Sequence, residues 1–192
     1  MNVYDFDGTI YDGESVFDFY LFTVKRQPKL LKYLYVVMKT LIRYKLCKVS
    51  ESELLYLAKK YAGQYLQELH NPEQTVCDFW DKYQKKIKPF YSLIQKEDDI
   101  VISASVELLL KEILNRIGVK QYICTVLDVE NGEITEFCYR KTKVSLFQSK
   151  YPNTVIENFY TDSENDRAMI KIAKKSFLVK GNSVKQIKQM EE

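Results

Sequence analysis

Two carboxylates separated by a single residue stand near the start of the chain, in the stretch DFDGT at residues 5–9. Asp5 and Asp7 follow a short apolar run, and Gly8 and Thr9 come directly after them. Neighbouring carboxylates repel each other unless a cation lies between them, and a site with only oxygen ligands suits Mg²⁺. The stretch therefore indicates a magnesium site. The alternative is a capped turn after a strand, in which Asp satisfies free backbone amides.

The elements predicted from the rest of the chain would bring further polar groups to the same place. A short buried strand over residues 2–6 precedes a long helical block, and strands then alternate with helices. This alternation implies a parallel sheet with crossover helices, in which ligands bind at the carboxyl ends of the strands. Later strands are predicted at 100–103, 155–160 and 176–180, a hairpin at 121–140 with its Asn-Gly turn at 131–132, helices at 105–118 and 143–151, and a loop and helix at 162–175.

Four more polar side chains should meet Asp5 and Asp7 at this edge of the sheet. Ser103 ends the second strand, Lys143 begins a helix, and Asp162 and Asp166 follow the strand at 155–160. Each of these residues has an ordinary alternative when it is taken alone. Ser103 would be a buried serine bonded to the backbone, Lys143 a solvated lysine, and Asp162 part of a helix N-cap.

The order and spacing of these residues resemble the haloacid dehalogenase superfamily of phosphohydrolases over nearly the whole chain. Its four motifs correspond to DFDGT, to Ser103 in VISAS, to Lys143, and to the acidic pair Asp162 and Asp166 in DSEND. A helical insertion directly after the first motif resembles the phosphoserine-phosphatase-like branch. The segments DGTIYDGESVFDFY, KRQP and YTDSENDRAM are similar to its phosphatidylglycerophosphatase-C-like members.

The resemblance implies a role for each matching residue. Asp5 would attack phosphorus and carry an aspartyl-phosphate, and Asp7 would protonate the leaving group and then deprotonate water. The Asp5 carboxylate would raise the pKa of Asp7, as an acid at neutral pH requires. Mg²⁺ would be held by Asp5, the backbone carbonyl of Asp7, and Asp162, with Asp166 supporting the ion directly or through water.

The resemblance implies that Ser103 and Lys143 bind the phosphoryl oxygens of the substrate. Ser105 is expected to cap the following helix and is also a candidate ligand of the substrate. The family's lysine motif often reads CYGxxK, and here Arg140 stands in place of Gly. That alignment favours Lys143 over Lys141, because Lys143 begins the helix and would lie beside a phosphate-binding N-terminus. Two further departures are Thr161 in place of Gly and Val106 in place of Pro.

The predicted fold class is α/β, with a doubly wound parallel-sheet core of the HAD-like, Rossmann type and an inserted all-helical cap. We expect the core to comprise residues 1–13 and 96–192 and the cap residues 14–95. Prolines divide the cap into predicted helices at 14–26, 29–46, 51–69 and 73–87. A chain of 192 residues is long enough for one such core and a smaller insertion.

The cap contains an unusually basic segment. Between Phe19 and Ser50 there are eight Lys and Arg residues and no acidic residue. An ordinary cap helix that packs its wide apolar face on its neighbours explains this pattern. The second interpretation is a cationic amphipathic helix, so that residues 25–45 would make a peripheral contact with an anionic membrane. No nucleic-acid-binding motif accompanies these charges.

Cysteine, histidine and hydropathy patterns exclude several other classes. Four scattered cysteines without a CxxC pair, and a chain whose first strand begins at residue 2, predict reduced thiols in a cytoplasmic protein. A single histidine argues against a zinc cluster. No apolar run approaches the ~20 residues of a membrane span. The sequence gives no indication of an oligomeric state.

The function predicted from the sequence is a Mg²⁺-dependent phosphatase that acts on a small phosphomonoester through an aspartyl-phosphate on Asp5. One alternative is a lipid-phosphate phosphatase at the membrane surface, with a substrate similar to phosphatidylglycerophosphate. A second is a phosphotransferase, in which an alcohol replaces water. A third is a non-catalytic binding protein with the same fold, which would require the loss of a catalytic group, and no catalytic group is missing.

Overall fold

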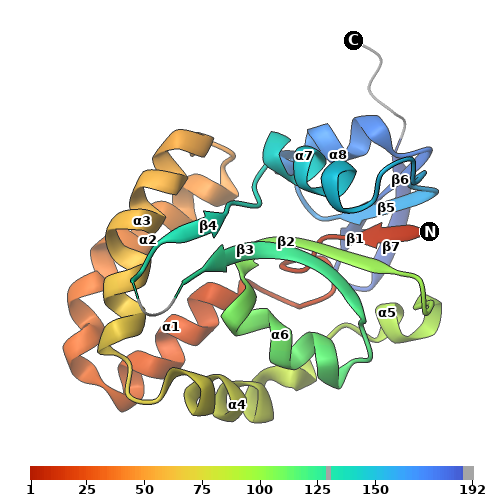
Figure 1. Ribbon diagram of the computed structural model, residues 1–192. Coiled ribbons are helices and arrows are strands. Elements are labelled where there is room, and N and C mark those ends of the chain that lie inside the picture. Colours follow the sequence, from red (N-terminus) through yellow and green to blue (C-terminus); the bar gives the residue numbers. More distant parts are fainter. Residues whose placement is uncertain (129–130, 188–192) are drawn as a thin grey trace.

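The strands form one mixed sheet within residues 1–128 and 131–187, the part of the chain that the computed structural model describes (Figure 1). The strand order is β4-β3-β2-β1-β5-β6-β7. The inner strands are parallel, and the edge strands β4 and β7 pair antiparallel with their neighbours. The bounds are β1 (Asn2–Tyr4), β2 (Ile100–Val106), β3 (Gln121–Leu127), β4 (Ile134–Glu136), β5 (Asn158–Thr161), β6 (Lys175–Lys180) and β7 (Ser183–Ile187).

The strand order reverses beside β1. From β1 the chain first builds the sheet toward β2 and β3, and later adds β5 and β6 on the other side of β1. Ligands of open α/β sheets bind in the crevice at such a switch point, outside the carboxyl ends of the strands. Tyr4 pairs with Tyr160 in the β1–β5 ladder, so Asp5 and Asp162 leave neighbouring strands at the same edge.

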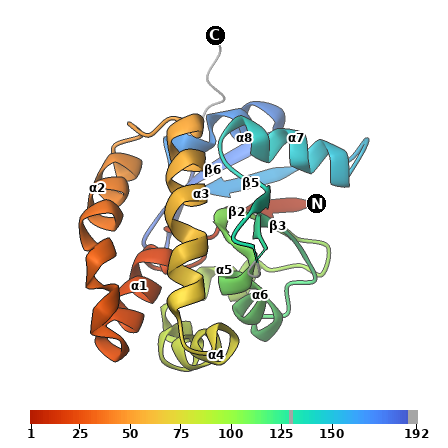
Figure 2. The ribbon, with the colours of Figure 1, turned by 60° about the vertical axis from the view of Figure 1, so that its left-hand side comes forward.

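Helices cover both faces of the sheet and its carboxyl edge (Figure 1). On one face lie α4 (Pro72–Tyr83), α5 (Pro89–Ile94) and α6 (Glu107–Arg116), and on the other lie α7 (Lys141–Lys150) and α8 (Arg167–Ile172). At the carboxyl edge stand α1 (Ser15–Arg26), α2 (Leu34–Lys45) and α3 (Glu51–Glu68), and Figure 2 shows α2 and α3 side by side there. Short 3₁₀ segments are η1 (Pro28–Tyr33), η2 (Gln84–Lys86) and η3 (Glu164–Asp166). The predicted doubly wound α/β core is confirmed.

Local sequence signals explain where the cap helices begin. Pro72 and Pro89 each occupy the first position of a helix, where proline's missing N–H costs nothing. Asn71 caps α4 by accepting a hydrogen bond from the Gln74 amide, and Ser50 caps α3 by accepting one from the Glu53 amide at 3.1 Å. The insertion returns to its starting point, because the Lys88 amide donates to the Ile10 carbonyl at 2.8 Å.

Several expectations about the elements differ from the structure. Helix α7 begins at Lys141, so Lys143 lies in its first turn and does not begin it. The single helix expected over 29–46 is divided into η1 and α2. Strand β2 continues through Val106, so the next helix begins at Glu107 and Ser105 is not its N-cap. Strand β7 was not predicted, because its residues are exposed except for the half-buried Ile187 and its sequence shows no apolar alternation. The division into core 1–13 plus 96–192 and cap 14–95 remains a prediction.

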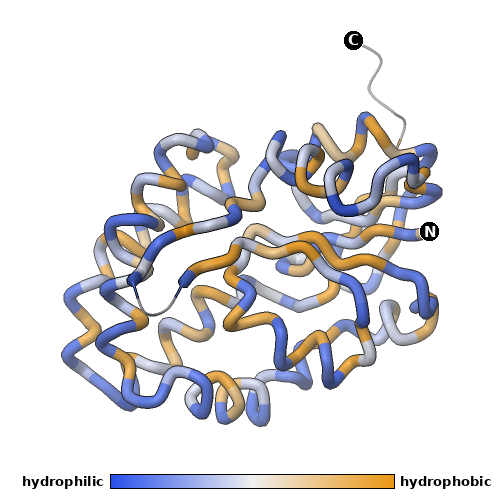
Figure 3. Tube along the Cα trace, in the orientation of Figure 1, coloured by the Kyte–Doolittle hydropathy of each residue, from blue (hydrophilic) through white to orange (hydrophobic). Residues whose placement is uncertain are grey.

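Apolar packing holds the sheet between its helix layers, and Figure 3 shows hydrophobic residues along the central strands. Trp80 of α4 is fully buried against Phe6 and Tyr11, and its indole N–H donates to the Leu109 carbonyl at 2.6 Å. This contact fixes α4 on α6, below the loop that carries the first motif. Within the described residues, no helix is both long and apolar enough to cross a membrane, and all four cysteines are free thiols.

Candidate active site

The loop after β1 is built so that Asp5 and Asp7 project from the switch point. The Asp5 amide donates to the Tyr160 carbonyl at 2.9 Å, which extends the β1–β5 pairing by one residue. The chain then turns, with Gly8 at a φ of 73°. A Cβ on Gly8 would lie 2.0 Å from Oδ2 of Asp162, so only glycine lets the Asp162 carboxylate lie against this loop. The glycine of DFDGT therefore brings the first and fourth motifs together.

Lys143 links two of the predicted carboxylates. Its ammonium lies 2.8 Å from Oδ1 of Asp5 and 2.7 Å from Oδ1 of Asp166, and all three side chains are buried. Burial disfavours the charged amine, but the carboxylates of Asp166 and Asp5 outweigh it and raise the pKa of Lys143 above its ordinary value. Lys143 is therefore a fixed positive charge beside Asp5. Lys141 is exposed at the start of α7, and its backbone amide donates a hydrogen bond to the Glu51 carboxylate.

Asp166 is held in place from its other side by Thr161. The Thr161 hydroxyl donates to Oδ2 of Asp166 at 2.9 Å, so both carboxylate oxygens have a partner. The same hydroxyl oxygen accepts a hydrogen bond from the Ser163 amide at 3.1 Å. Thr161 occupies a position at which the haloacid dehalogenase superfamily often has glycine. Here its side chain orients Asp166, which in turn pairs with Lys143.

Asp7 is bound by two donors that the sequence did not connect with it. The Ser15 amide donates to Oδ1 at 2.5 Å, and the Ser105 hydroxyl donates to Oδ2 at 2.6 Å. Burial raises the pKa of the Asp7 carboxyl above its ordinary value, although both hydrogen bonds oppose the shift. Ser105 thus serves Asp7 and not the helix terminus. The Ser105 amide in turn donates to Oγ of Ser103 at 3.1 Å, which fixes the buried Ser103 beside it.

The structure gathers all seven predicted residues at the carboxyl edge and adds three charged ones. Glu14 and Lys45 form an ion pair at the cap side of the site, and the Lys88 ammonium donates to the Gly8 carbonyl. Burial, together with the charge of Asp7, raises the pKa of Glu14 to about 7, although Lys45 opposes the shift. The surplus of bases between Phe19 and Ser50 was a signal for a cap cation near the carboxylates, but it did not single out Lys45.

Replacing Glu14 with Gln should change the pH dependence of stability. The folded-state pKa of about 7 lies above the ordinary 4.5, so the stability that the neutral carboxyl supports is complete below pH 4.5 and is lost as pH rises toward 7. Between pH 4.5 and 7, the free energy of unfolding of Glu14→Gln should therefore rise relative to that of wild type by on the order of 3 kcal/mol. Urea unfolding of both proteins in EDTA would measure this, and a stability difference independent of pH would contradict it.

The donor set fits Mg²⁺. Burial raises the pKa of the Asp5 and Asp162 carboxyls, with Lys143 and Lys45 respectively opposing it, and the charges of Asp166 and Asp162 add to the shift at Asp5. A cation at this point would relieve that crowding. Among the described residues, no three His, Cys, Asp or Glu side chains already form a metal-binding group. Mg²⁺ requires only one or two carboxylates, because it keeps water and substrate oxygens as its other ligands.

A cavity of about 300 Å³ opens from the carboxylates into the cap. Asp5, Asp7, Glu14, Ser103 and Ser105 line its polar end. Mostly aliphatic and aromatic side chains line the rest, from α1, η1, α2 and α3 and also from α4, α6 and strands β2, β3 and β4. Among the described residues that line it there is no Lys, Arg, His, Asn or Gln. Close packing of α3 on the β3–β4 turn requires glycine at residue 63, because a Cβ there would lie 2.7 Å from the Cα of Gly132.

Comparison with protein families agrees with this geometry. The family model described as haloacid dehalogenase-like hydrolase matches residues 3–171, which include every residue of the site. The chain belongs to this family. It is therefore a member of a family of hydrolases, as the motifs predicted. A comparison with curated proteins gave no match.

Solved structures with the same fold include relatives of the predicted branch. A Bordetella pertussis Tohama I protein of unknown function aligns with a TM-score of 0.71 and 15% identity, over 92% of this chain and 87% of that one. A phosphoserine phosphohydrolase-like protein from Francisella tularensis aligns with a TM-score of 0.58 and 16% identity, over 92% and 86%. A phosphoserine phosphatase in its apo form gives 0.56 and 15%, over 91% and 82%. The resemblance to the phosphoserine-phosphatase-like branch is confirmed for the fold.

Proposed function

We propose that the protein is a Mg²⁺-dependent phosphomonoester phosphatase that works through an aspartyl-phosphate on Asp5. The observation that carries the proposal is the buried Asp5 carboxylate, held at the switch point 2.8 Å from the Lys143 ammonium with Asp7 two residues away. Family membership supports it. Positioning and charge neutralisation make up most of what phosphoryl transfer requires, and this site supplies both.

Two proton-coupled steps complete the reaction. An Asp5 oxygen bonds to phosphorus while the ester P–O bond breaks, and the leaving alkoxide takes a proton from Asp7. Asp7 then accepts a proton from a water molecule while the oxygen of that water attacks the phosphorus of the aspartyl-phosphate. The bond between Asp5 and phosphorus breaks, which releases phosphate and restores the Asp5 carboxylate. The raised pKa of Asp7 suits the first step. Lys143 and Ser103 would bind the phosphoryl oxygens, with Ser105 orienting Asp7.

Mg²⁺ would be held by the Asp5 and Asp162 carboxylates and the Asp7 backbone carbonyl, and it would supply positive charge to the phosphoryl oxygens. Asp166, whose two oxygens contact Lys143 and Thr161, would support the site through Lys143. The direct test is hydrolysis of 4-nitrophenyl phosphate by the purified protein. We expect turnover with Mg²⁺ and its loss in EDTA, restored by added Mg²⁺. Undiminished turnover in EDTA would contradict the proposal.

The cavity favours one substrate class over another. Phosphoserine carries a carboxylate and an ammonium group, and the described residues that line the cavity include no cation for the carboxylate. Lys45 and Lys143, at its polar end, are already paired with carboxylates of the protein. Burying such charges unpaired is costly, whereas an apolar alcohol gains by leaving water. Three of the tyrosine hydroxyls among the lining residues are already bonded within the protein: Tyr65 to Thr23 at 2.5 Å, Tyr33 to Glu68 at 2.9 Å and Tyr20 to the Leu30 carbonyl at 3.3 Å. A lipid-like phosphomonoester is therefore the favoured substrate, and octyl phosphate should be hydrolysed with a higher kcat/KM than phosphoserine.

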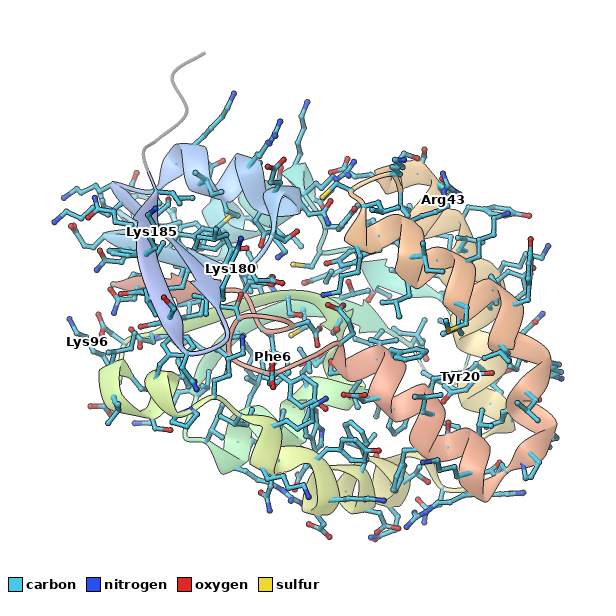
Figure 4. The ribbon with its side chains drawn as sticks, turned by 180° about the vertical axis from the view of Figure 1, so that it is seen from behind. Phe6, Tyr20, Arg43, Lys96, Lys180 and Lys185 are labelled. Atoms are coloured by element: carbon cyan, nitrogen blue, oxygen red, sulfur yellow. The ribbon has the colours of Figure 1, made fainter. Side chains whose placement is uncertain are left out.

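The outer face of α2 supports contact of residues 25–45 with an anionic membrane surface. No residue of α2 is buried, and the exposed fractions reach 76% for Tyr35 and 54% for Ile42. Large apolar residues recur at helical spacing along this face, at Leu31, Leu34, Tyr35, Met38, Ile42 and Leu46. In the view from behind, Arg43 lies near the outer end of α2, away from Tyr20 of α1 (Figure 4). Arg43 is paired with Glu53, but the Lys39 ammonium lies 5.7 Å from the centre of the exposed Tyr35 ring and so flanks this face. An apolar face with such a base beside it suits the interface of an anionic bilayer.

Vesicle sedimentation would test this contact. The protein should sediment with phosphatidylglycerol vesicles at low salt and not with phosphatidylcholine vesicles. Ile42→Glu should reduce the binding, whereas Leu93→Glu, at a residue 84% exposed on α5, should not. Absence of binding to the anionic vesicles would refute the contact. A cytoplasmic location remains a prediction, and so does hydrolysis in preference to phosphotransfer. Analysis of the products formed with added alcohols would distinguish hydrolysis from phosphotransfer.

A further inference from the structure

The loop between α2 and α3 is tied to the catalytic segments by several hydrogen bonds that span the cap and the sheet. The Tyr44 carbonyl accepts from Nδ2 of Asn165 at 3.2 Å, and the Cys47 carbonyl accepts from Nη2 of Arg140 at 2.9 Å. The single O–H of Tyr139 is shared between the Val49 carbonyl at 3.3 Å and Oδ1 of Asn165 at 3.2 Å. The contacts therefore run along the whole cap loop, residues 44–51. A further one, from the Lys141 amide to the Glu51 carboxylate at 2.8 Å, closes its far end.

Asn165 is the centre of this network. It is 6% exposed, and its Oδ1 accepts hydrogen bonds from Nε and Nη2 of Arg140 at 3.3 and 3.0 Å and from the Tyr139 hydroxyl at 3.2 Å. Its Nδ2 donates in the opposite direction, to the cap loop. Both ends of the amide are therefore used, one toward Arg140 and one toward the cap. Asn165 also lies between Asp162 and Asp166 in the chain, so it connects the cap loop to the fourth motif.

Arg140 adopts a backbone conformation that favours glycine. Its φ of 49° and ψ of −112° lie outside the regions that ordinary residues occupy, and Cys47, its partner across the contact, has a φ of 54°. Such conformations persist only where surrounding contacts compensate the strain, and they cluster at clamps and active sites. The family motif often has glycine at this position. Arg140 keeps this strained backbone conformation, and its guanidinium donates hydrogen bonds to both Asn165 and the Cys47 carbonyl.

We propose that Arg140 and Asn165 are positioning residues that dock the cap loop over the active site. Arg140 is three residues before Lys143, and Asn165 adjoins Asp166, so one pair of side chains joins the cap to both ends of the Lys143–Asp166 ion pair. The docked loop carries Lys45, whose ammonium pairs with Glu14 at the polar end of the cavity. Docking thus completes the cavity that receives the alcohol of the substrate, and it leaves the phosphoryl-binding groups where the sheet holds them.

The first test is independent of catalysis. Arg140→Gly removes the guanidinium and suits the local backbone, so the variant should fold. Charge-assisted hydrogen bonds lost from the loop should speed amide exchange of residues 44–51 about tenfold or more, with no change in β1, β2 and β5. Arg140→Lys keeps the charge and the strain but not the planar fork, and it should give an intermediate rate. Lys141→Ala, which leaves the backbone donor in place, is the matched control and should exchange like wild type.

The second test separates positioning from catalysis and rests on the proposed function. In Arg140→Gly the KM for octyl phosphate should rise about tenfold with little change in kcat, while the inhibition constant of inorganic phosphate stays unchanged. Asn165→Ala should act similarly, and the double variant should lose little more, because both residues serve one contact. Unchanged exchange of residues 44–51, or an equal loss of phosphate affinity, would overturn the proposal. If wild type hydrolyses no phosphomonoester, the proposed function fails, and the exchange experiment still decides the docking.

Discussion

Asp5→Asn should lower kcat for 4-nitrophenyl phosphate on the order of ten-thousand-fold, to the background of the assay. The substitution replaces one carboxylate oxygen with an amide nitrogen of nearly the same size, so the side chain can still occupy the space beside Lys143. An amide does not attack phosphorus, and no aspartyl-phosphate can form. Steady-state assays with Mg²⁺ would measure the loss, and trapping of phosphate on the wild-type protein, absent in Asp5→Asn, would assign it to the missing nucleophile.

The stability of this variant separates lost chemistry from lost folding. Burial raises the pKa of the Asp5 carboxyl well above its ordinary value of 3.8, although Lys143 opposes the shift. The ionised carboxylate therefore costs stability as pH rises above 3.8, and a neutral amide avoids that cost. Asp5→Asn should be at least as stable as wild type at neutral pH. Asp12→Asn, on the exposed part of the same loop, is the control and should keep its activity. Substantial turnover by Asp5→Asn would refute the mechanism.

The predicted site residues that the structure brings together owe their positions to the topology of the sheet more than to local conformation. Asp5 and Asp162 each follow a strand and Ser103 lies within β2, and parallel strands bring their carboxyl ends to one edge whatever the lengths of the helices between them. The preference for Lys143 over Lys141 came from the motif spacing and from the expectation that Lys143 begins the helix, but α7 begins at Lys141. Residues two positions apart on a helix point about 200° apart around its axis, so only one of these lysines can face the sheet. The structure places Lys143 inward and Lys141 outward.

The parts that the sequence did not predict depend on contacts between distant residues. A serine before a helix can cap it or bond elsewhere, and the partner of Ser105 is Asp7, 98 residues away. Thr161 in place of glycine looked like a simple departure from the family, yet its hydroxyl orients Asp166. Arg140 in place of glycine gave no hint of its backbone strain or of its contact with Cys47. The Ser105–Asp7 and Arg140–Cys47 pairs join residues 98 and 93 positions apart, so no short-range pattern encodes them. Thr161 is only five residues from Asp166, but its departure from glycine did not by itself indicate that partner.

Lys143→Met should cost both stability and activity. The ammonium is 2% exposed and is the partner of two carboxylates, so its loss leaves Asp5 and Asp166 buried together without their shared cation. Removing one partner of a buried ion pair costs about 3–5 kcal/mol, more than a methionine of similar volume can offset by packing. Activity should fall roughly a thousandfold, because the phosphoryl group also loses a positive charge. Urea unfolding and aryl phosphate assays would measure the two losses.

The response of this variant to Mg²⁺ is a test of the metal site that needs no turnover. A ligand that binds only the folded protein stabilises it by mass action, and the gain grows with affinity. If Asp5 and Asp162 hold the ion, removing the neighbouring Lys143 charge strengthens their attraction for it. Mg²⁺ should therefore raise the Tm of Lys143→Met by more than it raises that of wild type, whereas Lys141→Met, which alters an exposed lysine, should respond like wild type. An equal Mg²⁺ shift in all three proteins would place the cation away from Asp5.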